Sequence, residues 1–205
     1  MNQSKIKQMT KDEIIIQAII DAAKKLIQQY GLNKTTMEDI AKAAGKGKST
    51  LYYYFKSKED IFDEVIKQEM DDFFGQVKKA VDKEIDAHDK LKTYIVVKIK
   101  TLKNKISLYR FAIEHDPHIV NINEQFSKLR DRYDNAEIEL ISSILKLGVK
   151  DKLFKIPDNN SIKVLSELMV TCIRGIEMEV ITKNKYSSLA NQADLLANII
   201  TKGLN

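Results

Sequence analysis

Apolar residues recur every three or four positions along nearly the whole chain, which is the spacing of one face of an α-helix. In the first such stretch they include Ile15, Ile19, Ala22 and Leu26. The alternation of apolar and polar residues that is typical of strands does not occur. The pattern predicts helices over residues 12–30, 35–44, 48–54, 57–81, 88–104, 107–115, 121–148, 160–183 and 188–203. We therefore expect an all-α fold.

Glycines and hydroxyl residues mark where the first helices are expected to begin and end. Gly31 follows the first helix, at the position where glycine commonly ends one. Thr35 and Thr36 are N-cap candidates for the second helix, and Ser57 is the candidate for the long helix that begins there. A short turn at residues 44–47 separates the second helix from the third.

Composition narrows the class of protein. The 205 residues are 43% hydrophobic, enough for a buried core, and only 7 glycines and 2 prolines interrupt them. So few chain breakers argue against collagen-like, low-complexity and β-sandwich proteins. The single cysteine excludes an internal disulfide and favours a reducing compartment. No apolar run approaches the roughly 18 residues that span a bilayer, and the polar N-terminus lacks the apolar centre of a signal peptide, so we expect a cytoplasmic protein.

Positive charge is concentrated in the first 60 residues. They hold 11 lysines and 7 acidic residues, a net charge of +4, whereas residues 61–205 are near neutral at +1. A polyanion partner for the N-terminal segment fits this distribution. The same segment holds three short helices, so we expect a small N-terminal domain at residues 1–56 and a larger helical domain at residues 57–205.

The three short helices, with a tight turn between the second and the third, are typical of a helix-turn-helix. In the third helix, Leu51 and Phe55 are four residues apart and are expected to face the core. A lysine and small hydroxyl side chains at the start of such a helix can reach base edges in a major groove, while tyrosines and lysines suit phosphate oxygens. The residues turned outward are Lys48, Ser49, Thr50, Tyr52 and Tyr53. An ordinary amphipathic surface helix is the alternative, but consecutive exposed tyrosines are costly without a partner.

Two segments of this region, TTMEDIAKAAG at residues 35–45 and STLYYYFKSKEDIF at residues 49–62, resemble the DNA-binding signature of TetR/AcrR-type transcriptional regulators. The resemblance covers about residues 12–66. It implies a homodimer in which each N-terminal helix-turn-helix DNA-binding domain is followed by a larger ligand-binding and dimerisation domain. It also implies a phosphate contact for Thr36, base-edge positions for Lys48, Ser49 and Thr50, and DNA-backbone positions for Tyr52, Tyr53, Tyr54 and Lys58.

Three positions depart from the family pattern. Lys46 replaces a usually aliphatic residue and is a candidate phosphate contact, with a plain solvated side chain as the alternative. Gly47 stands where the family often has serine, and Ser49 stands where it usually has glycine. These differences bear on the choice of operator and leave the tyrosines in place.

For the larger segment, the resemblance implies a cavity among the middle helices that binds a small effector, which we expect to be lipophilic. Aromatic, methionine and cysteine side chains are candidate lining residues, although each fits plain core packing as well. The candidates are Phe73, Phe74, Tyr94, Phe111, Phe126, Tyr133, Met169, Cys172 and Met178. The expected function is that of a transcriptional repressor, which releases a palindromic double-stranded DNA operator when the effector binds.

The last two predicted helices carry apolar rows that are too broad for one buried face. Two such helices from each of two chains can form a four-helix bundle, so we expect homodimerisation through them. Packing inside the core of one chain is the alternative.

Other chemistry finds no support in the residue pattern. His115 and His118 have no further histidine or cysteine ligand nearby in the sequence. The chain also lacks nucleophile-elbow, P-loop and dinucleotide-binding motifs. We therefore expect no metal, no cofactor and no enzymatic activity. Two rival functions stay open, a helical module that binds an acidic protein and an enzyme that uses the helical cavity.

Overall fold

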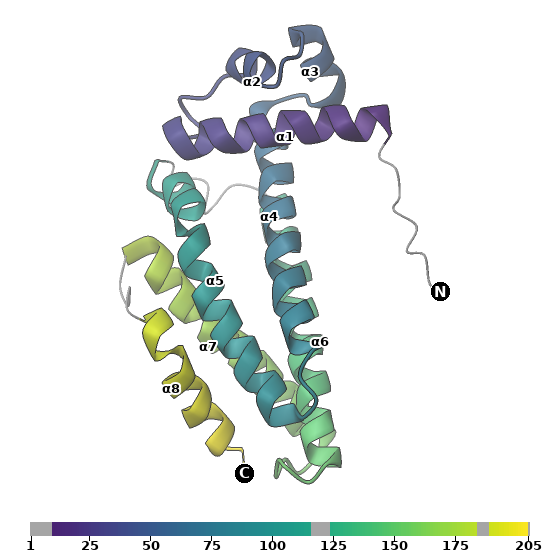
Figure 1. Ribbon diagram of the computed structural model, residues 1–205, viewed down its shortest axis with the longest axis vertical. Coiled ribbons are helices and arrows are strands. Elements are labelled where there is room, and N and C mark those ends of the chain that lie inside the picture. Colours follow the sequence, from purple (N-terminus) through teal and green to yellow (C-terminus); the bar gives the residue numbers. More distant parts are fainter. Residues whose placement is uncertain (1–9, 116–123, 184–188, 205) are drawn as a thin grey trace. The chain divides into compact units, whose positions relative to one another are not determined.

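A computed structural model describes residues 10–115, 124–183 and 189–204, and the side chains of all of these except residues 102–115, 124–130, 178, 180–183 and 189–190. This part of the chain is built of α-helices and contains no strand, so the all-α prediction is confirmed (Figure 1). The helices are α1 (Lys11–Tyr30), α2 (Met37–Ala43), α3 (Lys48–Tyr54), α4 (Lys58–Val81), α5 (Ala87–His115), α6 (Glu124–Lys150), α7 (Asn159–Lys183) and α8 (Leu189–Lys202). No helix within the described residues has the length and apolarity needed to cross a membrane.

The chain divides into two compact units, residues 1–68 and residues 69–205. The division falls inside α4, so the first turns of this helix belong to the N-terminal unit and its last turns to the second unit. The functional boundary expected between residues 56 and 57 lies just before α4 and stays a prediction.

Side-chain caps start α2 and α4 in the first unit. Thr36 is the N-cap of α2, where it forms a capping box with Asp39. Ser57 exchanges equivalent hydrogen bonds with the third residue after it, at the start of α4. Thr35, the other candidate, is buried and donates to the carbonyl oxygen of Gly31 at 2.7 Å. Each cap satisfies backbone N–H groups that a helix start leaves without partners.

Gly45 makes the turn between α2 and α3 possible. Its φ of 64° lies in the left-handed region, which residues with a Cβ rarely adopt. The N–H of Lys46 donates to the carbonyl oxygen of Ala41 at 2.9 Å and closes the end of α2. The helix-turn-helix predicted from the sequence therefore has its turn at the expected residues.

An apolar core holds the helices of the first unit together. Ile19 and Ile27 of α1, Ile40 of α2, Leu51 of α3 and Ile61 of α4 are fully buried. The middle helix, α2, packs on both α1 and α3 (Figure 1). Burying one such side chain stabilises the fold by about 1.5–3 kcal/mol. Core packing of this kind compensates for the low intrinsic stability of helices as short as α2 and α3.

In the second unit, α5 is the central helix. It contacts α6, α7 and α8, and α6 also packs on α7 (Figure 1). Leu91 and Ile95 of α5 share a core with Ile141 of α6 and with Ala193 and Ala197 of α8. The two alanines are fully buried, and their small side chains let α8 approach α5 closely.

One prediction about the second unit is wrong. The apolar pattern favoured two helices at residues 88–104 and 107–115, but α5 runs unbroken from Ala87 to His115. The residues between the two predicted helices include neither glycine nor proline. An interruption in apolar spacing does not by itself end a helix, because the backbone hydrogen bonds can continue through it.

A close approach at the end of α6 requires glycine at position 148. The ring of Phe154 lies against Gly148, and a Cβ at that position would overlap the ring atoms. The N–H groups of Leu153 and Phe154 both donate to the carbonyl oxygen of Gly148, at 2.8 and 3.1 Å. Because Phe154 is buried in the core of the second unit, this turn fixes the path of the chain from α6 towards α7.

Candidate nucleic-acid interface

The exposed face of α3 carries residues for which the sequence predicts DNA contacts. Leu51 is fully buried, whereas Tyr52 and Tyr53 are 45% and 79% exposed. Lys48 and Ser49 are exposed as well. The buried leucine therefore anchors α3 with these four side chains outward, as predicted, and their contacts with DNA stay a prediction.

Three further residues of this region are partly covered. Thr50 and Lys46 are half-buried, so they lie at the edge of the exposed face. Phe55, which was expected in the core of α3, is also only half-buried because it follows the helix as its extended C-cap residue. The predicted DNA contacts of Thr50 and Lys46 stay predictions.

The start of α3 has no side-chain cap. Gly47 is its N-cap residue, with an ordinary φ of −73° and no hydroxyl to accept from the helix. A Cβ at this position would meet only the hydroxyl oxygens of Ser49 and Thr50, each at 3.9 Å. The serine that is common here in the resembling family would therefore fit.

Lys48 has partners within the chain. Its ammonium forms an ion pair with Glu38 of α2 and lies 5.8 Å from the ring centroid of Tyr52. The hydrogen bond between Lys48 and Glu38 lowers the pKa of the carboxyl group and raises the pKa of the ammonium. Both groups are therefore charged at neutral pH. Sequence reasoning missed this pairing, because the two residues lie on different helices.

Thr36 and Lys58, both expected on phosphates, also make internal bonds. The Thr36 hydroxyl donates to the carboxylate of Asp39 at 2.7 Å. The Lys58 ammonium donates to the carbonyl oxygens of Leu32 and Asn33, at 2.9 and 3.4 Å. Lys58 thereby ties the start of α4 to the loop between α1 and α2. A phosphate that binds these groups has to share them with, or take them from, their present partners.

Tyr54 joins α3 to α1. Its hydroxyl donates to a carboxylate oxygen of Asp12 at 2.6 Å, and its ring meets the ring of Tyr53 edge-on with centroids 4.9 Å apart. The bond to Asp12 raises the pKa of Tyr54 to about 12, so the phenol stays protonated at neutral pH. The resemblance implied a DNA-backbone contact for Tyr54, and the contact that the structure describes is with Asp12.

A surface cleft of about 600 Å³ opens beside α2. Lys34 and Lys42 line it together with one acid, Asp39, and with the ring of Tyr30. Two lysines and one acid give its lining a net positive charge. Its residues come from the end of α1, the following loop and α2, and several of them lie in the segment at residues 35–45 that carries the resemblance.

In the second unit, the predicted effector-lining residues fall into different environments. Phe73 and Met169 pack against the core, and Phe74 is half-buried. Tyr94 and Tyr133 are buried. Cys172 is exposed, so it does not line the interior of the unit as expected. The side chains of Phe111, Phe126 and Met178 lie outside the described residues.

A buried polar cluster around Lys98 was missed by sequence reasoning. Lys98 of α5 forms an ion pair with Glu137 of α6, and its ammonium lies 3.4 Å from Oε1 of Glu177 on α7. The Tyr94 hydroxyl donates to Glu137 at 3.2 Å. Among the described residues, Oε1 of Glu177 has no hydrogen-bond partner. One ammonium thus faces two carboxylates in the interior.

Burial governs the ionisation of this cluster. It raises the pKa of Glu177 to about 7, against the opposing effect of Lys98. Burial also disfavours the charged form of Lys98, but Glu177 and Glu137 together hold the pKa of this ammonium above its usual value. Near neutral pH, Lys98 is therefore charged while Glu177 is partly protonated.

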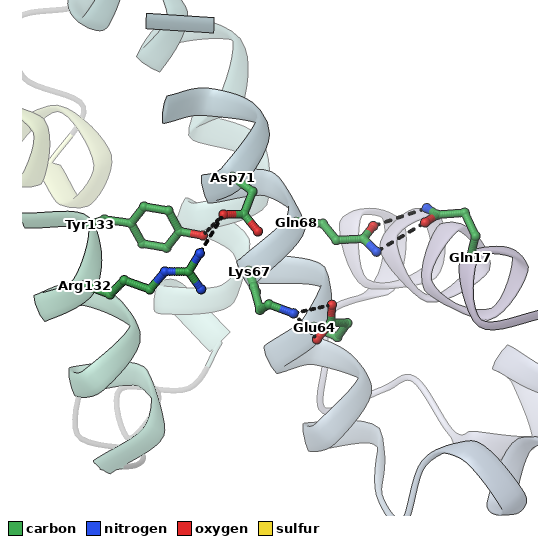
Figure 2. Close-up of polar contacts among 7 residues, drawn as sticks. All are labelled: Gln17, Glu64, Lys67, Gln68, Asp71, Arg132 and Tyr133. Atoms are coloured by element: carbon green, nitrogen blue, oxygen red, sulfur yellow. Dashed lines mark hydrogen bonds and ion pairs between the residues drawn. The ribbon is translucent and has the colours of Figure 1, made fainter. Parts of the chain in front are cut away.

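Polar contacts on α4 differ between the two units. In the first unit, the side-chain amides of Gln17 on α1 and Gln68 on α4 exchange two hydrogen bonds of 3.2 Å (Figure 2). In the second unit, the Tyr133 hydroxyl donates to Asp71 at 2.6 Å, and the Arg132 guanidinium lies 3.7 Å from the same carboxylate (Figure 2). The same helix is thus held by side-chain bonds in each unit.

Comparison with known proteins bears on the whole arrangement. The family model described as bacterial regulatory proteins, tetR family, matches residues 19–65, which include α2 and α3. The HTH-type transcriptional repressor KstR2 of Rhodococcus jostii is 33% identical over 138 residues, which cover 67% of this chain and 66% of that repressor. The HTH-type transcriptional regulator QacR of Staphylococcus aureus is 30% identical over 163 residues, covering 77% of this chain and 81% of QacR.

A solved structure extends this likeness along most of the chain. The crystal structure of a transcriptional regulator from Cytophaga hutchinsonii has a TM-score of 0.75 and 28% identity to this chain. The match covers 92% of this chain and 97% of that regulator. The likeness therefore includes both compact units and extends well beyond the helix-turn-helix.

Proposed function

This chain belongs to the TetR family of bacterial regulatory proteins, and from that premise we propose that it represses transcription as a homodimer whose two α3 helices read an inverted-repeat operator. The observation that carries the proposal is the outward face of α3, where Lys48, Tyr52 and Tyr53 are exposed. Exposed lysines and phenols suit phosphate oxygens and base edges. Two such helices require half-sites about one helical turn apart, or a multiple of that distance.

The dimer interface is proposed to lie on α7 and α8. Val164 and Leu168 are four residues apart on α7, Leu195 and Ile199 are four apart on α8, and all four side chains are between 45% and 62% exposed. Nothing lies within 4 Å of where a Cβ on Gly175 would stand, so the backbone of α7 is open to a close neighbour there. Apolar faces of this kind favour burial against a second copy.

Sedimentation measurements test this interface. Leu168→Glu is expected to weaken dimerisation at least tenfold, because it places a charge in the buried patch. Leu153→Glu, at another exposed leucine that precedes α7, is the matched control and should leave the dimer intact. Equal effects of the two variants would contradict the assignment of the interface.

The effector is proposed to be a small lipophilic molecule that binds the second unit and releases the operator. The apolar core around α5 supports this class of ligand, since buried apolar helices with few polar groups suit lipophilic molecules. A ligand can act only by binding the two states of the protein unequally. We propose α4 as the element that carries the response, because it contributes to both compact units.

Selection of duplexes from a random pool is the direct test of the function. An inverted repeat among the bound sequences supports both sequence specificity and two-fold symmetry. If each head neutralises about four phosphates, log affinity falls with log salt at a slope of roughly −7. The absence of any preference over scrambled competitor, even at low salt, would overturn the proposal.

Substitution of Tyr53 tests whether α3 contacts the operator. Tyr53→Phe removes a hydroxyl from each head, and the loss of one hydrogen bond per head should cost about 1–3 kcal/mol of operator affinity per dimer. Tyr30→Phe is the matched control, because Tyr30 is also well exposed in the first unit but lies at the end of α1. If the chain is instead a helical module that binds an acidic protein, both variants should retain the weak DNA binding of the wild type.

A further inference from the structure

An acidic side chain, Glu38, lies beside one of the lysines that are proposed to contact DNA. Glu38, the second residue of α2, forms its ion pair with Lys48, the first residue of α3. The two side chains are 55% and 61% exposed, so neither is needed in the core. A carboxylate at this place repels phosphates, and it weakens any attraction that depends on net positive charge alone.

The pair restrains Lys48, which the proposed function places against DNA. Lys48 is held from α2 by the carboxylate and lies over the ring of Tyr52, its neighbour on α3. The pKa directions of both partners indicate that the pair is fully ionised at neutral pH. An exposed ion pair of this kind is weak and is screened by salt. DNA can therefore displace it, but only at some cost to the affinity.

We propose that Glu38 is a specificity-determining residue, which holds Lys48 in an internal ion pair and thereby weakens binding to non-specific DNA more than binding to the operator. The inference rests on the proposed function, in which α3 lies against a duplex. Non-specific binding consists almost entirely of phosphate attraction, so it bears the full cost of the carboxylate.

The operator can compensate for that cost. A guanine edge offers O6 and N7 as acceptors for the Lys48 ammonium, while the amino group of cytosine is a donor that a carboxylate can accept. The pair thus combines a donor and an acceptor of the kinds that a G·C base pair presents in the major groove. A phosphate offers acceptors only and can satisfy only the lysine.

The test compares the full-length protein with the Glu38→Gln variant on two duplexes, the selected operator and a scrambled sequence. Affinities are measured by fluorescence anisotropy from about 50 to 200 mM salt. For the scrambled duplex, Glu38→Gln is expected to tighten binding about 2- to 30-fold per dimer. It should also steepen the salt slope by up to about 2, which is one extra charge per head. The ratio of operator to non-specific affinity should fall.

Two controls separate the ion pair from a general change in charge. Glu64→Gln removes the same charge from the same unit, where Glu64 pairs with Lys67 at 2.8 Å along α4 (Figure 2). Its effect on the slope should be much smaller than that of Glu38→Gln. In a Lys48→Gln background, Glu38→Gln should no longer steepen the slope, because there is no lysine left to release.

The possible failures are distinguishable. Equal slopes for Glu38→Gln and Glu64→Gln overturn the inference, since net charge alone then explains the effect. An effect of Glu38→Gln that persists without Lys48 overturns it too, because the carboxylate then acts by simple repulsion. If the wild-type protein binds no duplex at all, the proposed function fails and the inference fails with it. Binding with an unchanged specificity ratio overturns the inference alone.

Discussion

Glu177 gives the stability of the second unit a pH dependence that one substitution can remove. Burial raises the pKa of this carboxyl group from 4.5 to about 7. Between these two values the folded chain holds a proton that the unfolded chain has already released. The free energy of unfolding therefore falls as the pH rises through this window and levels off above it. A shift of this size corresponds to roughly 3 kcal/mol.

The perturbation is Glu177→Gln, which has nearly the shape of the protonated acid and cannot ionise. The free energy of unfolding is measured by urea denaturation between about pH 5 and pH 8, at a fixed protomer concentration because the protein is a proposed dimer. Over this range, the free energy of unfolding of the wild type is expected to fall by up to roughly 3 kcal/mol more than that of the variant. At the upper end, the variant should be the more stable protein.

Glu139→Gln is the control, because it removes an exposed carboxyl group from α6 and should leave the pH dependence as in the wild type. The reasoning is refuted if Glu177→Gln follows the wild-type pH dependence. It is also refuted if this variant is the less stable protein at about pH 8. In that case the carboxylate is ionised and Lys98 stabilises it more than burial destabilises it.

Three further predictions concern single contacts. Gly148→Ala should lower the free energy of unfolding by about 1–3 kcal/mol, because the new Cβ overlaps the ring of Phe154; unchanged stability in a thermal melt would contradict the packing. Tyr54→Phe should lower the free energy of unfolding, because the hydrogen bond to Asp12 is lost, and adding Asp12→Asn should then lower it little further; additive effects in a double-mutant cycle would contradict the bond. Gly47→Ser should raise the free energy of unfolding by about 0.5–1 kcal/mol, because serine caps α3 and restricts the unfolded chain; denaturant titration would expose the idea as wrong if stability fell.

The beginnings of the short helices could be predicted from the sequence because capping is local chemistry. Thr36 and Ser57 bond to residues three positions further on, so the signal and its partner lie within a single turn. Gly31 ends α1 for a similarly local reason, as its N–H donates to the carbonyl oxygen of Ile27 at 2.9 Å. Helical spacing also predicts the burial of Leu51, which is fully buried, but not the end of α3 before Phe55, which leaves that ring half-buried.

What the sequence does not reveal depends on partners far along the chain. The bond between Tyr54 and Asp12 joins residues 42 positions apart, and no helical spacing encodes it. The burial of Lys98 is a similar case, because its compensating carboxylates come from α6 and α7. From the sequence alone, a charged residue in the middle of a helix is expected to face solvent, because acids that lie near it only in the folded chain are not apparent. Such residues are therefore found from tertiary packing and not from pattern.

The lysines of the first unit contribute less to DNA affinity than their number suggests. Lys48 already has Glu38 beside it, and Lys58 donates to two carbonyl oxygens of the loop between α1 and α2. A salt slope of roughly −7 assumes about eight phosphate contacts per dimer made by free cations. If both lysines keep their internal partners in each head, about four contacts are weakened and the slope approaches roughly −4. The salt slope of the wild-type protein therefore shows whether DNA displaces these internal partners. A slope of roughly −7 means that both lysines contact phosphates, and that the measured affinity already includes the cost of breaking their internal bonds.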